Sequence, residues 1–202
     1  GNTTNQLQFV LGNPNDQPLS GRWTAGFTTF GAGVFRPSNG LIYLKNNLTT
    51  GYADYTMVLG IPGDVGLAGD WNGDSLDSLG VYRPSNSTFY LNDQTCNCSL
   101  YGTYTFAYGV GGDAPVVGDW IGQGHDGVGL FRQSNGYTYL RNALTTGYAD
   151  ITFVYGIAGD VPVAGHWQLV YPPKPNPGSV LVPPTSAPIA TAKPQPTGGL
   201  GD

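Results

Sequence analysis

The sequence contains no glutamate: all 13 acidic residues are aspartate, and there is only one methionine. Because Glu and Met are good helix formers, their scarcity beside 32 glycines and 13 tyrosines favours strands and turns over helices. Only 10% of the residues are charged, the formal net charge is −5 and the basic residues form no cluster, which argues against nucleic acid or an anionic membrane as partners. No apolar run reaches the roughly 18 residues that a transmembrane helix needs.

Few residues could carry catalysis or bind a transition metal. The two histidines, His125 and His166, lie in different parts of the chain, and no Ser, Cys or acid accompanies either one in a triad-like arrangement. The two cysteines, Cys96 and Cys98, lack the second pair that a zinc site needs; they could form a local disulfide, bond to another chain or stay free. We therefore predict that the protein is not an enzyme.

The chain does contain an internal repeat. Its four tryptophans lie 47 to 49 residues apart, and each ends a related phrase: LSGRW, LAGDW, VVGDW and VAGHW. The seven residues LTTGYAD occur twice in the same phase, at residues 48–54 and 144–150. A repeat of this length is typical of solenoids, propellers and arrays, in which each unit buries its apolar face against its neighbours.

Each unit contains four short alternating stretches separated by Gly, Asn, Asp and Pro, which is the pattern of β-strands joined by turns. In the second unit these are the stretch that ends in LAGDW, then GVYR, TFYLN and YTFAYG. We therefore predict an all-β protein whose residues 1–171 form a propeller-like array of about three and a half four-stranded antiparallel repeats.

The two ends of the repeat domain each supply part of a fourth unit. Residues 7–12 match the last strand of a unit and residues 163–171 match the first, so we expect them to act as complementary halves. Either the two ends of one chain meet and close a small ring, or neighbouring chains supply the missing strands. The side chains of the first segment that we expect to take part in assembly are Leu7, Phe9 and Leu11.

Residues 172–202 form a Pro-, Ser- and Thr-rich tail that holds nine of the 16 prolines. This composition predicts an extended segment rather than a domain. The sequence SVLV at residues 179–182 could add a strand to the edge of a sheet through Val180 and Val182, and the prolines around it suit an edge position.

The strongest chemical motif is GDWNGDSLDSLGVYR at residues 69–83, which crowds four oxygen side chains into a short loop. These residues are Asp70, Asn72, Asp74 and Asp77. Calcium takes six to eight oxygen ligands from loops of this kind, so the sequence predicts a calcium site here. The alternative is that the Asp and Asn side chains form Asx-turns without metal.

This stretch resembles the calcium loops of FG-GAP repeats, which occur in integrin-alpha-type propellers and in many bacterial relatives. The likeness extends over roughly residues 7–167 and implies calcium between the first two strands of the second unit. The chain departs from the family pattern, because Ser75 replaces the turn glycine and Asp77 comes one position early. The third unit retains only Asp119 and Asp126, a weaker candidate site, and the first unit retains no acid. The candidate metal sites therefore lack some of the ligands of the family pattern.

Two charged positions recur in every unit, which favours an architectural role. We expect Arg-to-carboxylate bridges between strands. The arginines are Arg36, Arg83 and Arg132, and the aspartates are Asp16, Asp64, Asp113 and Asp160. The repeated Trp, Tyr and Phe residues are expected to pack between units, although a few could form a sugar-stacking surface.

Several residues could carry glycan if the protein is secreted. Four sequons could accept N-linked glycan, at Asn2, Asn47, Asn86 and Asn97. Hydroxyls among the prolines could accept O-linked sugar, at Ser179, Thr185, Ser186, Thr191 and Thr197. The absence of a signal peptide before Gly1 fits a mature, processed product. We expect an extracellular protein at the cell surface.

Together these features favour a non-enzymatic structural or adhesive subunit outside the cell. We expect copies to assemble head to tail into a filament or surface layer, with a terminal strand or the tail of one copy completing the open sheet of the next. The alternatives are a calcium-dependent carbohydrate-binding module and an accessory domain of a larger secreted protein.

Overall fold

The computed structural model describes residues 7–165, which form three four-stranded antiparallel sheets and contain no helix. The first sheet comprises β1 (Gln17–Gly21), β2 (Gly31–Arg36), β3 (Leu41–Lys45) and β4 (Tyr55–Val58). The second comprises β5 (Val65–Gly69), β6 (Ser78–Arg83), β7 (Thr88–Asn92) and β8 (Tyr104–Ala107). The third comprises β9 (Asp113–Gly118), β10 (Gly127–Arg132), β11 (Tyr137–Arg141) and β12 (Ile151–Val154).

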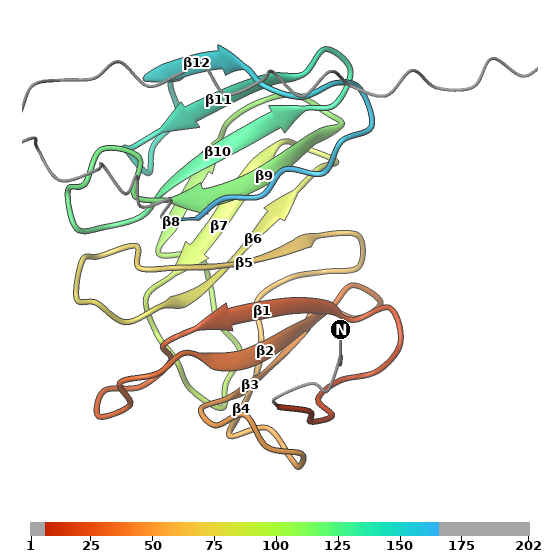
Figure 1. Cartoon of the computed structure of the whole chain (residues 1–202), viewed down its shortest axis with the longest axis vertical. Helices are drawn as coiled ribbons and strands as arrows, with labels where there is room; N and C mark the ends of the chain where they lie inside the picture. The colour runs from red at the N-terminus through yellow and green to blue at the C-terminus, as the bar shows by residue number, and fades with distance from the viewer. Residues whose placement is uncertain (1–6, 166–202) are drawn as a thin grey trace, which may run out of the picture. The chain divides into compact units, whose positions relative to one another are not determined.

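Each sheet is built from four consecutive strands that lie side by side in chain order (Figure 1). The first strand of a unit therefore forms one edge of its sheet and the fourth strand forms the other. The first strands of successive units are neighbours, since β1 lies beside β5 and β5 lies beside β9. The prediction of an all-β, propeller-like array of four-stranded repeats is confirmed.

The second strand of each unit is buried on both faces. In β6, Leu79 and Val81 join the core between the first and second sheets, whereas Tyr82 joins the core between the second and third. Successive side chains of a strand point to opposite faces, so one apolar strand can supply both cores. This explains why GVYR-like stretches lack the apolar–polar alternation of a half-exposed strand.

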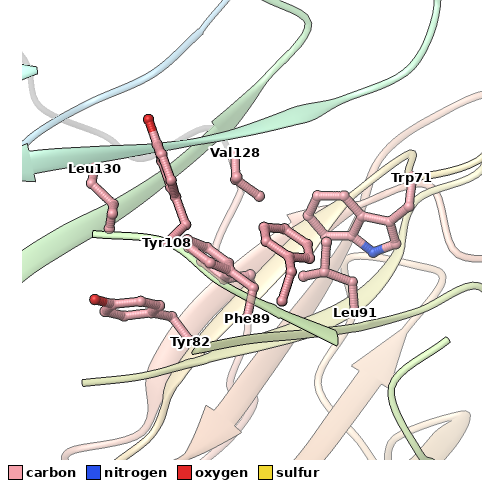
Figure 2. Packing of buried hydrophobic residues seen from close by; sticks show 9 residues of the cluster. Trp71, Tyr82, Phe89, Leu91, Tyr108, Val128 and Leu130 are labelled. Atoms are coloured by element: carbon pink, nitrogen blue, oxygen red, sulfur yellow. The ribbon is translucent and has the colours of Figure 1, made fainter. Parts of the chain in front are cut away.

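Aromatic residues fill the spaces between sheets, as expected from their repetition. Trp23 and Trp71 are only 3% and 2% exposed. In the core between the second and third sheets, Phe89 lies beside Tyr82 and Tyr108 (Figure 2). The ring centroid of Phe89 is 4.7 Å from that of Tyr82, and Phe89 stacks on Phe106 with 5.4 Å between centroids. Val128 and Leu130 of β10 close this core from the third sheet, so neither sheet buries its apolar face alone.

The expected Arg-to-carboxylate bridges are present in all three sheets. In the second, Arg83 Nε and Nη2 donate to the two carboxylate oxygens of Asp64 at 2.9 and 2.8 Å, and the guanidinium lies over the Tyr90 ring. The Asp64 side chain is 1% exposed, so the arginine neutralises a buried charge. The other two sets are Asp16, Arg36 and Tyr43, and Asp113, Arg132 and Tyr139.

The N-terminal end of the repeat domain differs from our expectation. Residues 7–12 form no strand. A fourth strand pairs with the third strand of its own unit, and in the described part of the chain no third strand precedes residues 7–12. First and fourth strands lie at opposite edges of each of the three described sheets.

Several sequence predictions lie partly or wholly outside residues 7–165. Residues 163–165, the start of the expected last strand, form no strand, and residues 166–171 are not described. The tail at residues 172–202, with Val180 and Val182, is not described either.

Candidate functional site

The predicted calcium loop between β5 and β6 is folded around the Asp70 carboxylate. Asp70 Oδ1 accepts hydrogen bonds from the backbone N–H groups of Gly73 and Asp74 at 2.7 and 3.2 Å. Asp70 Oδ2 accepts another from Ser75 N at 2.7 Å. Asn72 Oδ1 in turn accepts from Asp74 N at 3.0 Å. Side-chain oxygens that would face a metal thus serve backbone donors, which is the Asx-turn arrangement.

The third unit shows that this loop folds without the other acidic side chains. Asp119 accepts from the N–H groups of Gln123 and Gly124 at 2.9 and 2.8 Å, as Asp70 does in the second unit. These backbone donors hold the pKa of the Asp119 carboxyl below its usual range. Ser75 adopts a left-handed φ of 67°, where Gly124 has 85°. The replacement of the turn glycine by Ser75 therefore leaves the loop conformation unchanged, at the cost of backbone strain.

The last acid of each loop links its sheet to the preceding one. Arg22 N, directly after β1, donates to Asp77 Oδ2 at 2.6 Å, and Asp77 N donates back to the Arg22 carbonyl at 2.9 Å. One unit later, Asp70 N donates to Asp126 Oδ2 at 3.0 Å, and Asp126 N donates to the Asp70 carbonyl at 2.6 Å. We call each such pair of hydrogen bonds a carboxylate clamp. The clamps join the first sheet to the second and the second to the third.

Burial acts on both clamp carboxyls. It raises the pKa of Asp77 and of Asp126, and in each case the backbone N–H of the preceding sheet partly offsets this effect. In the first unit Phe30 takes the clamp position, and its side chain is 63% exposed. Sequence reasoning placed Asp77 and Asp126 among metal ligands and missed the clamps, although both residues share one phase directly before the second strand.

A cavity of about 230 Å³ lies between the first and second sheets. Trp23 and Tyr55 line it from the first sheet, and Asp74, Asp77 and Asp93 line it from the second. Asp93 Oδ1 is buried without a hydrogen-bond partner, and burial raises the pKa of this carboxyl. Within residues 7–165, however, no group of three or more His, Cys, Asp or Glu side chains is arranged to hold a metal ion.

The third sheet leaves uncovered a face that the other two sheets bury. Met57 of β4 and Phe106 of β8 are 1% and 4% exposed, whereas Phe153 at the same position of β12 is 42% exposed. Two residues later, Tyr108 is 7% exposed and Tyr155 is 82% exposed. In the first and second units, the following sheet covers these positions. Residues 7–165 contain no sheet beyond the third that could cover Phe153 and Tyr155. We call Phe153 and Tyr155 with their surroundings the open face.

The loop between the third and fourth strands also links neighbouring sheets. Cys96 and Cys98 form a disulfide in this loop of the second unit. Val58 N of β4 donates to the Cys98 carbonyl at 3.2 Å, and Leu100 N donates back to the Val58 carbonyl at 2.8 Å. The bond closes the chain locally, which corresponds to the first of the three pairings that the sequence left open. The disulfide constrains the part of the loop that is hydrogen-bonded to the first sheet.

Three candidate glycosylation sites are exposed, at Asn47, Asn86 and Asn97. Asn97 Oδ1 accepts a hydrogen bond from Thr56 N at 2.7 Å, so this residue also touches the first sheet. Asn2 and the tail candidates Ser179, Thr185, Ser186, Thr191 and Thr197 lie outside the described residues.

In comparisons with known proteins, no family model, curated protein or solved structure matches this chain. Across residues 7–165 the structure has no helix of the length and apolarity needed to cross a membrane.

Proposed function

We propose that this protein is a non-enzymatic structural or adhesive subunit outside the cell, and that copies associate through the open face of the third sheet. One observation carries the proposal: Phe153 and Tyr155 are exposed at positions where the preceding units bury their residues under the next sheet. The local disulfide fits an oxidising, extracellular environment. The aspartates of the described loops serve backbone donors and arginines, which is an architectural use.

Aromatic side chains are strong anchors for association. Burying one such residue removes roughly 150–250 Å² from water, and each buried Å² of apolar surface contributes about 25 cal/mol. Part of this gain offsets the lost translational and rotational freedom of the copies. An interface in which copies use different surfaces extends into a filament unless its rotation closes a ring.

The structure favours face packing over the strand addition that we expected. Each of the three sheets already has four strands, and the sheets contact one another through packed side chains and a few loop hydrogen bonds rather than by sharing strands. A copy that docks on the open face would repeat the apolar packing between sheets that occurs twice within the chain. The tail remains an alternative route to assembly.

Sedimentation velocity over a wide concentration range, with electron microscopy of the same samples, tests the proposal. We expect concentration-dependent association that Tyr155→Lys weakens. Tyr148→Lys is the matched control, because Tyr148 is 93% exposed on a loop of the same sheet. A wild-type protein that stays monomeric at every concentration would count against the proposal. If association is lost only after deletion of residues 172–202, the tail rather than the open face is responsible for assembly.

A calcium-dependent carbohydrate-binding module is the second candidate function. The cavity that Asp74, Asp77 and Asp93 line supports it, since carboxylates attract a divalent cation. Tyr52 and Tyr101, 95% and 86% exposed on the same loop of successive units, could stack on sugar rings. Calcium titration calorimetry and glycan binding with and without chelator test it. No heat of calcium binding and no chelator-sensitive glycan binding would exclude this function.

A further inference from the structure

We propose that residues 7–12 occupy the surface of the first sheet that receives the open face of a second copy, and that they leave it when copies associate. This inference rests on the proposed function and names the partner surface for the open face. In the free protein, residues 7–12 would cover this surface, and the third sheet of another copy would displace them.

Residues 7–12 contact the first sheet in the same way that the fourth strand of one unit contacts the sheet of the next unit. Val10 N donates to Thr50 Oγ1 at 3.0 Å. At the same position of the second unit, Ala107 N of β8 donates to Thr146 Oγ1 of the third sheet at 3.2 Å. The two contacts use the same donor position and the same acceptor position of the repeat.

A second contact shows the same correspondence. A Cβ atom added to Gly12 would lie 3.0 Å from Val34 Cγ1 of β2. A Cβ atom added to Gly60, the corresponding glycine after β4, would lie 3.1 Å from Val81 Cγ1 of β6. Both glycines therefore bring the backbone against the second strand of the following sheet. Residues 7–12 take the place of a preceding sheet's outer strand without belonging to a sheet.

The receiving surface of the first sheet matches that of the third. Residues 48–54 and 144–150 have the same sequence, LTTGYAD. Within the chain, residues 144–150 receive β8 through Thr146. Residues 48–54 offer the same acceptor, the hydroxyl of Thr50. The donor of the third sheet that corresponds to Ala107 N is the backbone N–H of Val154, a residue that is 56% exposed. The open face and the first sheet of a second copy thus form a complementary pair.

The two occupants compete, and residues 7–12 hold their place by fewer contacts. β4 and β8 are each tied to the third strand of their own sheet, whereas residues 7–12 have no strand partner in the described structure. Phe9 is only half-buried, whereas its counterparts Met57 of β4 and Phe106 of β8 are 1% and 4% exposed, so less apolar burial anchors the segment. An incoming β12 brings a complete four-stranded sheet with it.

The interface between copies would lack a carboxylate clamp. Asp77 and Asp126 supply the clamps within the chain, and Phe30 stands at their position in the first unit. The backbone N–H of Asp119, the counterpart of Arg22 and Asp70, would face this position of the second copy. Phe30→Asp should therefore supply the missing acceptor and strengthen association.

The experiment measures the association constant of full-length variants by sedimentation velocity. Phe9→Asp places a charge in a half-buried position of the segment and should raise the association constant at least about tenfold, because the segment no longer competes. Val10→Pro, which removes the N–H donor to Thr50 and also fixes the backbone φ at this position, should act in the same direction. Phe30→Asp should also raise the constant, and adding Tyr155→Lys to any of these variants should abolish the gain.

The possible outcomes separate this inference from the proposed function. Association that Tyr155→Lys weakens, but that Phe9→Asp and Val10→Pro leave unchanged or weaken, would overturn the displacement while the proposed function stands. No association in the wild type or in any variant would overturn both. Association that depends only on residues 172–202 would also overturn the displacement, because the tail would then be the occupant. Thermal melting of each variant confirms that its sheets remain folded.

Discussion

Replacing Asp126 by alanine should destabilise the protein, whereas replacing it by asparagine should not. Alanine leaves Asp70 N without its acceptor at 3.0 Å, at a partly buried position between the second and third sheets. Leaving a buried donor without an acceptor costs about 1–3 kcal/mol of the free energy of unfolding. We expect about 1–2 kcal/mol, because alanine also relieves the cost of burying a charge.

Asparagine keeps an oxygen in place for Asp70 N and removes the charge. Since burial raises the pKa of Asp126, the neutral side chain fits the native state better than the ionised one. Asp126→Asn should therefore leave the free energy of unfolding within about 0.5 kcal/mol of wild type at pH 7, or raise it. Asp77→Ala and Asp77→Asn should repeat this contrast at the first clamp.

Urea denaturation at pH 7, in chelator and again in calcium, measures these differences. A carboxyl with a raised native pKa contributes stability below its unfolded pKa and loses that contribution as the pH rises through its native pKa. Any advantage of asparagine should therefore shrink in acid, where Asp126 is protonated. Asparagine variants as damaging as alanine would refute the argument, and damage seen only with calcium would identify Asp77 or Asp126 as a metal ligand.

Three further predictions follow from other contacts. Arg83→Met leaves the Asp64 carboxylate buried without its partner and should lower the free energy of unfolding by about 3–5 kcal/mol; Arg83→Met with Asp64→Asn should recover part of the loss, and thermal melting measures both. Reducing the Cys96–Cys98 disulfide should speed hydrogen exchange at Val58 N, which donates to the Cys98 carbonyl, while Ala107 N, held by Thr146, exchanges as before. Arg36 lowers the pKa of Asp16, so the stability from this pair is present above the unfolded pKa of Asp16 and lost as the pH falls through its native pKa; urea midpoints of wild type and Asp16→Asn between pH 6 and about 2 should converge in acid.

The repeat made most of the fold predictable from the sequence. The period fixes which stretches are equivalent, so a weak strand signal in one unit gains support from the others. The aromatic packing and the Arg-to-Asp bridges followed for the same reason, because a residue that recurs at one phase meets the same neighbour in each unit. Tyr82 and Phe89, which lie in the core between two sheets, illustrate this.

Contacts between units were harder to predict. Asp77 reaches Arg22 from 55 positions away, and no local pattern distinguishes such an acceptor from a loop ligand. The sequence of residues 7–12 carries the alternation of a strand, but the ladder hydrogen bonds that define a strand come from a partner. The open face could not be predicted from the sequence either. Phe153 occupies the same repeat position as its buried counterparts, and only the structure shows that no further sheet within residues 7–165 covers it.

The contrast between the two kinds of interface sets the strength of any assembly. Sheets within the chain are joined by an apolar core, a carboxylate clamp and the covalent connection, which makes their packing intramolecular. Between copies the clamp position carries Phe30, no covalent connection helps, and residues 7–12 must first leave the receiving surface. Association should therefore be much weaker than the folding of the sheets, so diluting an assembly should release folded subunits before any sheet unfolds. Secondary structure that disappeared together with the assembly would contradict this order.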